Sequence, residues 1–520
     1  MKHGWQVCER VSVDVNRERP AVDAGWHRVH PASPFVRGWV ALAAVVVFFG
    51  RDIFERALQG RELLEEGLNG RILWLLAGGA ALLLVTVAGF VLSWYFTRYQ
   101  LSEGYVRVNT GFLFKQQRQA RLDRVQAIDI VQPLLARIFG LAELKFEVAD
   151  AGESAVRLAY LPIGQAKQLR ATILGRAAGV VADGGETAPV PEAPEQVVLS
   201  VPHGRLAGSL LLSEQSFFVV LGAIASVVFS VLTESGAVIL YLIPAILGLG
   251  AAYWKSFNKG FNFTAAISPD GIRLRYGLLD TQAQTVPPGR IQALKITQPP
   301  LWRILGWYRI QVNVAGYGGA PGNENAARTT LLPVGGLGEV MQTLALVLPD
   351  PGTPEPHRVF TAALNGLDSD AGFTTTPRRA RLIAPLGWRR NAFLSTGTAL
   401  LLRSGRWWRQ VVLVPHQRTQ SMALTQGPVA RRFGVADLVL HTTAGPVVPR
   451  LIQADVGEAV ALFDQQAARA REARKRQTSE QWLAELSRAG SLPVRLQPPA
   501  PLQAPADPTP TTPQEEPRHG

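Results

Sequence analysis

Histidine and cysteine are the residue types that most often hold metals or carry out nucleophilic chemistry, and this chain uses them sparsely. Its single cysteine, Cys8, excludes an internal disulfide framework and a thiolate metal cage. The histidines show no H-x3-H, HExxH or Cys/His spacing that would hold zinc. We therefore expect no enzyme, no metal and no cofactor. The histidines are His3, His27, His30, His203, His357, His416, His441 and His519.

Two segments resemble chemical motifs at first sight. GYGGAPGNENAA (316–327) is glycine-rich like a phosphate-binding loop, but it lies between two expected strands, and no Lys-Ser/Thr pair follows it. It predicts a long β-hairpin loop. His416 has Pro288 and Leu122 at the matching positions of the two related segments described next, so we expect a surface or turn histidine.

One pattern occurs three times without a gap: RVQAIDIVQPLLARIFG (124–140), RIQALKITQPPLWRILG (290–306) and RTQSMALTQGPVARRFG (418–434). With a glycine that precedes each copy, it reads G-x12-R-x-Q-x5-Q-x4-R-x2-G. Such a repeat indicates a triplicated domain. The repeated positions are Gly111, Arg124, Gln126, Gln132, Arg137 and Gly140, then Gly277, Arg290, Gln292, Gln298, Arg303 and Gly306, then Gly405, Arg418, Gln420, Gln426, Arg431 and Gly434.

The repeated arginines leave two interpretations open. They could bind backbone carbonyls or an acidic side chain in every copy, or they could bind anionic lipid headgroups, since a planar guanidinium suits phosphate. Cations and tryptophans outside the pattern are the better candidates for contact with a membrane surface. These are Lys115, Arg118 and Arg121 in the first copy, and Trp388, Arg389, Arg390, Arg403, Arg406, Trp407, Trp408 and Arg409 in the third. Alternation along a strand would, however, bury one of Trp407 and Trp408.

Alternating apolar and polar residues predict that each copy is mostly β, for example at YVRVNTG (105–111) and IRLRYG (272–277). The glycines after these runs are expected at hairpin turns. Helical patterns follow at 164–177, 338–348 and 457–470. Each copy should be a small sandwich or partly open barrel capped by one C-terminal helix. The segments QPLLARIFG, QPPLWRILG and QGPVARRFG should form bent turns whose apolar side chains plug one end.

Four apolar stretches predict two transmembrane hairpins: 38–50, extended to begin at residue 35, then 72–96, 216–233 and 236–254. For 38–50 a buried helix or re-entrant segment is the alternative. Cations follow 96 and 254, whereas the loop 51–70 has more acids than bases. The positive-inside rule therefore predicts that both termini and all three copies are cytoplasmic.

The order of paired apolar helices followed by this pattern resembles the bacterial pleckstrin-homology (PH) domain of the membrane-flanked family. HPASP (30–34) resembles the segment that enters the first helix in that family. The resemblance covers 26–170, 205–348 and 380–470. It implies a PH-like β-sandwich for each copy and no known enzymatic activity. The third copy departs from the pattern because RRARLIAPLGWRRNAF (378–393) is too charged to span.

The expected organisation is therefore a cytoplasmic N-terminal segment (1–34), hairpin one (35–96), PH-like domain one (97–177), a linker (178–204), hairpin two (205–255), domain two (256–348), a linker (349–377), domain three (378–470), and a basic helix with a proline-rich tail (471–520).

The net charge of +13 predicts an anionic partner. Since the cations flank apolar segments, we expect that partner to be the bilayer and not nucleic acid. The first hypothesis is that the protein is a multi-pass scaffold of the bacterial inner membrane whose PH-like domains bind lipid or protein. We expect it to have protein partners or to form a homo-oligomer. A component of a transport complex is the alternative, weakened by the lack of ionisable residues in 72–96, 216–233 and 236–254.

Overall fold

The computed structural model describes most of the chain. The described residues are 25–33, 35, 36, 38, 39, 43, 70–101, 105–111, 115–121, 125–148, 156–177, 196–233, 242–268, 271–286, 288–315 and 329–476. The structure divides into two compact units, Met1–Asp123 and Arg124–Gly520. The expected first span, the loop 51–69 and the C-terminal tail lie wholly or largely outside the described residues.

The first unit combines one long helix with a small sheet. Helix α2 (Gly70–Phe96) leads into strands β2 (Arg98–Leu101), β3 (Tyr105–Thr110) and β4 (Gln116–Arg121), and β1 (His27–Arg28) completes the order β1-β2-β3-β4. The indole of Trp94 on α2 donates a hydrogen bond to the carbonyl of Val29 at 2.9 Å. The segment before the helices is thereby attached to the end of α2.

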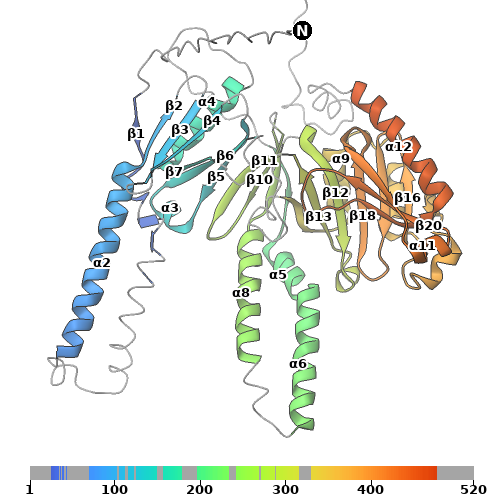
Figure 1. Cartoon of the computed structure of the whole chain (residues 1–520), viewed down its shortest axis with the longest axis horizontal. Helices are drawn as coiled ribbons and strands as arrows, with labels where there is room; N and C mark the ends of the chain where they lie inside the picture. Colours follow the sequence, from blue (N-terminus) through green and yellow to red (C-terminus); the bar gives the residue numbers. More distant parts are fainter. Residues whose placement is uncertain are drawn as a thin grey trace, which may run out of the picture. The chain divides into compact units, whose positions relative to one another are not determined.

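The second unit contains two seven-stranded sheets and one three-stranded sheet (Figure 1). The first sheet has the order β7-β6-β5-β11-β10-β9-β8, and every adjacent pair is antiparallel. Its strands are β5 (Val125–Gln132), β6 (Leu141–Val148), β7 (Val156–Pro162), β8 (Gln196–Ser200), β9 (Thr264–Ser268), β10 (Gly271–Tyr276) and β11 (Thr281–Val286).

The second seven-stranded sheet has the order β14-β13-β12-β18-β17-β16-β15, and the last sheet has the order β19-β20-β21. The strands of these sheets are β12 (Ile291–Gln298), β13 (Tyr308–Val314), β14 (Thr330–Gly335), β15 (Thr374–Thr375), β16 (Ala392–Ser395), β17 (Ala399–Ser404), β18 (Arg409–Pro415), β19 (Ser421–Thr425), β20 (Val435–His441) and β21 (Arg450–Asp455).

Each seven-stranded sheet is shared by two copies of the repeat. Strands β5 to β7 of the first copy continue into β8 to β11 of the second through the pair β5·β11. Strands β12 to β14 of the second copy continue into β15 to β18 of the third through the pair β12·β18. Neighbouring copies are therefore joined by hydrogen bonds between strands. The separation of the copies in the sequence does not indicate this pairing.

The expected capping helices are present. Helices α4 (Ile163–Ala177), α9 (Leu337–Val347) and α12 (Val456–Arg476) follow the last strands of copies one, two and three. Helix α12 continues past residue 470, so the basic residues 471–476 extend the cap and do not begin a separate element. There Arg474 donates to the carbonyl of Thr419 at 2.9 Å.

The repeated glycines occupy equivalent turns. Gly111, Gly277 and Gly405 have φ of 97°, 117° and 78°, a region that glycine enters without steric cost. A Cβ on Gly277 would lie 2.0 Å from the carbonyl oxygen of Asp280, and one on Gly405 equally close to that of Trp408. These positions therefore require glycine, as the sequence predicts.

Parts of two regions expected to be linkers are folded. Strand β8 lies within 178–204, and helix α10 (Pro356–Asn365) lies within 349–377. Helix α10 buries one apolar face, including Val359, Phe360 and Leu364, in the same core as β12, β13, β17 and β18. The linker prediction is wrong at these places because the charged and proline residues around α10 conceal a short amphipathic helix.

The expected spans are observed in part. Within the described residues, two helices are long and apolar enough to cross a membrane, α2 over Ala77–Phe96 and α6 (Glu214–Leu232), and neither is buried inside the protein. Helix α8 (Leu242–Gly260) begins inside the fourth expected span and continues to Gly260, past Lys255 and Lys259. Four spans in two hairpins therefore stay a prediction.

Candidate membrane-facing surface

Helices α6 and α8 project from one end of the second unit (Figure 1). The hydroxyl groups of Ser216 on α6 and Tyr253 on α8 form a hydrogen bond near the base of the pair. Before α6, the short helix α5 (His203–Leu211) packs against the second copy, where Arg205 forms an ion pair with Glu339 of α9 at 2.5 Å. The expected bounds of the second hairpin, 205–255, are therefore wrong at this end, because α5 packs on the domain.

The turn after β12 lies beside this base. The indole of Trp302, fully buried in the 3-10 turn η3 (Leu301–Arg303), donates to the carbonyl of Ser209 on α5 at 3.1 Å. Ile304 and Leu305, which follow at once, are 83% and 48% exposed. The prediction that the apolar side chains of these turns plug the domain is therefore wrong for Ile304 and Leu305, and likewise for Ile138 and Phe139 of copy one, which are also exposed.

The hairpin that joins β17 to β18 lies next to the same turn. Arg303 donates from Nη2 to the carbonyls of Arg406 and Trp407 at the tip of this hairpin. Arg406 is exposed, and Trp407 and Trp408 are 55% and 43% exposed. The alternative in which one of the two indoles is buried is therefore wrong, because both belong to the turn between the strands and not to a strand.

Arg303 thus acts as a connection between copies, and Arg137 has the same place one copy earlier. Arg137 lies in α3 (Leu134–Ile138), and its Nη1 approaches the carbonyl of Leu278 in the β10–β11 hairpin at 3.5 Å. Both contacts favour the structural interpretation for this repeated arginine. Arg431, the third member, lies in α11 (Pro428–Arg432) and is exposed.

The other repeated polar residues also make local contacts. Gln132 and Gln426 each donate to the carbonyl of the first residue of the next strand, Leu141 and Val435, at 3.0 Å. Gln292 donates to the carbonyl of Arg290 at 3.3 Å, and Gln298 is buried. Arg290 and Arg418 both end a 3-10 turn, η2 (Pro288–Arg290) or η7 (His416–Arg418), and so lie just before a strand and not on it. Arg124 and the side chain of Gln126 are outside the described part of the chain.

Two of the proposed lipid contacts are wrong, because Arg390 and Arg403 are each only 1% exposed. Arg390 donates to the carbonyls of Ala363, Leu364 and Gly366 at the end of α10. Arg403 donates to those of Ala362, Asp368 and Arg390. Arg390 therefore binds the carbonyls of Ala363 and Leu364, which the last turn of a helix leaves without backbone partners, and Arg403 connects the end of α10 to the carbonyls of Asp368 and Arg390.

Burial is the main cause of the pKa shifts of these arginines. It lowers the pKa of Arg390 to about 9, with a further contribution from the neighbouring cation of Arg403, and it lowers that of Arg403 to about 10. Asp370 and Asp368 act in the opposite direction on Arg403. The carbonyl contacts compensate the loss of water around the two charges.

The remaining predicted surface residues are accessible to different degrees. Lys115, Arg118 and Arg121 are exposed on or just before β4, Trp388 is half-buried, and Arg409 donates to the side-chain oxygen of Asn365 at 3.0 Å. Arg389 is exposed and forms an ion pair with Asp368 at 2.5 Å.

His416 lies in a turn, one of the two expected places, and because it is buried the surface alternative does not apply. Its Nε2 is 2.9 Å from the carbonyl oxygen of Thr396, and its Nδ1 is 3.0 Å from the side chain of Gln466 on α12. Burial lowers the pKa of the imidazole, and the contact with Thr396 raises it in part. The ring connects the turn after β16, the turn η7 and the capping helix.

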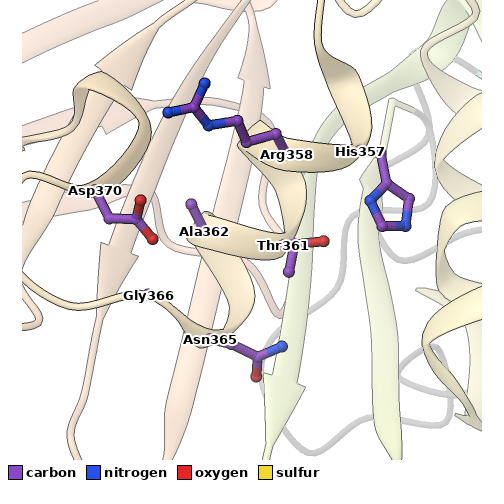
Figure 2. A pocket seen from close by; sticks show the side chains of 7 residues that line it. All are labelled: His357, Arg358, Thr361, Ala362, Asn365, Gly366 and Asp370. Carbon is purple, nitrogen blue, oxygen red and sulfur yellow. The ribbon is translucent and has the colours of Figure 1, made fainter.

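A hollow of about 480 Å³ lies beside α10 and is lined by His357, Arg358, Thr361, Ala362, Asn365, Gly366 and Asp370 (Figure 2). The residue types around it combine one carboxylate with a guanidinium and an imidazole. Within the described residues, no group of three or more His, Cys, Asp or Glu is placed to hold a metal ion.

Comparison with known proteins agrees with this architecture. A family model described as "Bacterial PH domain" matches residues 42–177, 216–348 and 359–470. The UPF0699 transmembrane protein YdbT of Bacillus subtilis (strain 168) is 23% identical over 274 residues, which cover 48% of this chain and 55% of that protein. The chain thus matches about half the length of this curated relative. With three matched regions that coincide with the three copies of the repeat, the chain belongs to the bacterial PH domain family.

Proposed function

We propose that this chain is a non-enzymatic, multi-pass protein of the bacterial inner membrane, whose PH-like domains lie on the cytoplasmic leaflet and bind lipid headgroups or partner proteins there. One observation carries the proposal. Exposed apolar, aromatic and cationic side chains of copies two and three lie next to Trp302 and Arg303 in the chain or bind them, and Trp302 binds α5, the helix that leads into the exposed apolar helix α6.

A chain of contacts supports the position of these side chains. Helix α5 ends at Leu211, and α6 begins at Glu214 after the N-cap Ser213. Trp302 binds the carbonyl of Ser209 on α5, and the adjacent Arg303 binds the carbonyls of Arg406 and Trp407. If α6 crosses the bilayer, the tip of the β17–β18 hairpin lies near the headgroups.

The composition of this tip suits such a location. Indole rings favour the depth of the headgroups, where their apolar surface and their N–H group are both accommodated. A cation near an anionic leaflet contributes about 1 kcal/mol to the free energy of membrane binding. Arg406 would therefore add a small favourable term to that of the inserted helix α6. The tip would orient the third copy, which is without a helix pair of its own among the residues described.

Depth measurements on the full chain in lipid nanodiscs test the proposal. In a Cys8→Ser background, a nitroxide label is placed at Trp407→Cys or at Ile304→Cys, and the control label is placed at Glu472→Cys on the exposed face of α12. We expect the first two labels to be relaxed more by oxygen, which concentrates in the bilayer, and the control more by a water-soluble nickel chelate. Aqueous accessibility at all three positions would contradict a membrane-facing tip.

A further inference from the structure

Two strands of the repeat, one in each unit, lack a neighbour on one side within the described residues. Strand β4, the last of the first sheet, pairs with β3 only, and β19, the first of the last sheet, pairs with β20 only. The equivalent strands inside the array do pair: β5 with β11, and β12 with β18. In the gap-free alignment of the copies, β4 is equivalent to β11 and β18, and β19 is equivalent to β5 and β12. The two open edges are therefore of the two kinds that already pair with each other within this chain.

The register of the two internal junctions is the same. With the copies aligned without gaps on Gly111, Gly277 and Gly405, Gln132 is equivalent to Gln298, and Thr281 to Arg409. Gln132 pairs with Thr281, and Gln298 pairs with Arg409. The junction is thus a conserved feature of the repeat within this chain and not an accident of one pair of strands.

The open edge of β19 carries apolar side chains that the internal junctions bury. Leu424 is equivalent to Ile130 and Ile296, which are 6% and 1% exposed, yet Leu424 itself is 38% exposed. Met422 is equivalent to the buried Ile128 and Leu294 and is itself half-buried. A strand paired with β19 would remove this apolar surface from water.

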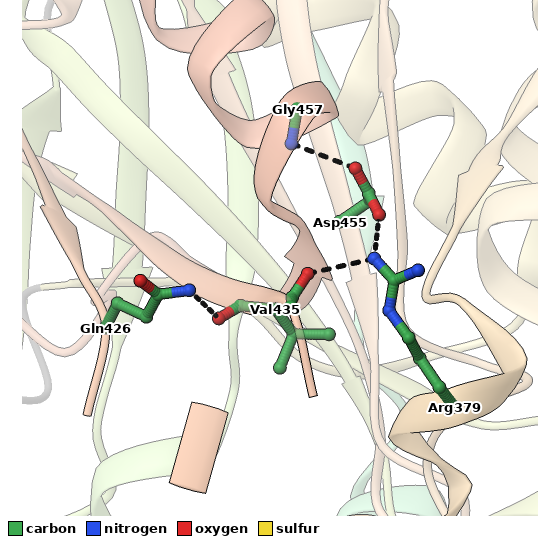
Figure 3. A network of polar contacts seen from close by, with 6 residues as sticks. Arg379, Gln426, Val435, Asp455 and Gly457 are labelled. Atoms are coloured by element: carbon green, nitrogen blue, oxygen red, sulfur yellow. Dashed lines mark hydrogen bonds and ion pairs between the residues drawn. The ribbon is translucent and has the colours of Figure 1, made fainter. Parts of the chain in front are cut away.

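Among the described residues, no side-chain hydrogen bond joins the repeated arginine of the third copy to a hairpin. Arg137 and Arg303 reach the hairpin carbonyls of the next copy, whereas Arg431 is exposed at the end of the array. One contact at the end of β19 nevertheless matches that at the end of β5 in the first internal junction. Gln426 binds the carbonyl of Val435 as Gln132 binds that of Leu141, and Arg379 secures the turn at Gly434 and Asp455 (Figure 3).

We propose that β19 of one chain pairs with β4 of a second copy of this chain, antiparallel and in the register of the internal junctions. Leu424 then lies opposite Gln117, and Ala423 opposite Arg118, while Arg431 reaches the β3–β4 hairpin of the second chain. Such a contact joins two different surfaces, so it produces a row or a closed ring of chains and not a symmetric pair. It also covers two strand edges that would otherwise be open to aggregation.

Cross-linking between differently tagged full chains tests the register. Both chains carry Cys8→Ser; one carries Leu424→Cys, and the other carries Gln117→Cys. After co-expression and mild oxidation of the membranes, we expect a disulfide-linked species that contains both tags. Opposite residues of antiparallel strands have Cβ atoms about 4.5–5.5 Å apart, whereas the adjacent Arg118 faces the other side of the sheet. The control pair, Leu424→Cys with Arg118→Cys, should therefore cross-link much less.

Two variants test the arginine contact without altering either strand. We expect Arg431→Ala to reduce co-purification of differently tagged, cysteine-free chains by roughly tenfold, equivalent to about 1.4 kcal/mol. The neighbouring exposed Arg432→Ala should leave co-purification unchanged. Absence of mixed species in both experiments would overturn the proposal, as would equal cross-linking of Gln117→Cys and Arg118→Cys. A disulfide that forms within one chain carrying both Leu424→Cys and Gln117→Cys, and not between chains, would also overturn it.

Discussion

The cations of the third copy differ in what surrounds their charged groups. The guanidinium groups of Arg390 and Arg403 are enclosed by backbone carbonyls, and Arg403 also lies over the ring of Phe373 at 4.6 Å. Arg389, next to Arg390 in sequence, is exposed and paired with Asp368. Positive charge at this place therefore stabilises the packing of the domain. The net charge of the chain is larger than the charge that is accessible to a membrane.

At the residue scale, His416 should make the third copy sensitive to acid. Its pKa is lowered by burial, so the folded protein holds the ring neutral at a pH at which the unfolded chain, with a pKa of about 6.5, takes up a proton. The stability associated with the neutral ring is complete above about pH 6.5 and is lost as the pH falls toward the lowered value. Hydrogen exchange of α12 in the full chain should therefore accelerate more between pH 7.5 and pH 5.5, after correction for the intrinsic exchange rate, than that of α9.

The matched control for this prediction is His441, which is exposed at the end of β20. His416→Gln should reduce the excess acceleration in α12, whereas His441→Gln should not. Identical pH profiles for the two variants and the parent chain would show that His416 does not govern the acid sensitivity.

At the element scale, α10 replaces an apolar hairpin in front of the third copy. Its buried face joins the core shared by copies two and three, and its last carbonyls are bound by Arg390 and Arg403. Cations near the C-terminus of a helix also interact favourably with its dipole. A short helix held in this way ties the third copy to its neighbour without crossing a membrane.

We expect Arg403→Met to destabilise the end of α10, because the carbonyls of Ala362 on the helix and of Asp368 and Arg390 beside it would lose a charged donor at a cost of about 2–4 kcal/mol. Protection of the α10 amides against hydrogen exchange should fall by at least about thirtyfold. Arg389→Met is the control, since an exposed ion pair contributes about 1 kcal/mol or less. Equal protection in the two variants would mean that Arg403 does not hold the end of the helix.

At the scale of the whole molecule, copies two and three behave as one continuous structure. Asn313 on β13 is completely buried and connects the copies: its Nδ2 donates to the carbonyl of Val447 at 2.6 Å, and its Oδ1 accepts from the N–H of Val447 at 2.9 Å. Lys295 on β12 donates to the carbonyl of Pro446 at 2.9 Å. Together with the shared sheet, these contacts favour cooperative unfolding of the two copies over independent unfolding of each.

Topology is the prediction that belongs to this scale. In a Cys8→Ser background, Gln59→Cys should react with a membrane-impermeant thiol reagent applied to cells whose outer barrier is permeable to it, because the loop 51–70 has more acids than bases and is expected outside. Pro510→Cys should react only after the inner membrane is opened. Reaction of both from outside would contradict four spans with cytoplasmic termini.

The sequence by itself determined the number of copies, the β character of each, the glycine turns and the capping helices. These features depend on residues close together in the chain: alternation specifies a strand, and Gly277 or Gly405 specifies a turn that other residues cannot enter. The family resemblance rested on the same local pattern. The match of the bacterial PH domain family model to three regions of the chain confirms this resemblance.

Only the tertiary structure decided which strands pair and which cations are buried. An edge strand can pair with any suitable edge, so the period of two along β12 or β18 does not reveal that they join across copies. Arg390 and Arg389 are adjacent in sequence, yet one is enclosed by carbonyls of residues 363–366 and the other faces solvent. The partners that decide this difference lie more than twenty positions away, because burial is set by packing between distant segments and not by the type of a residue or its neighbours.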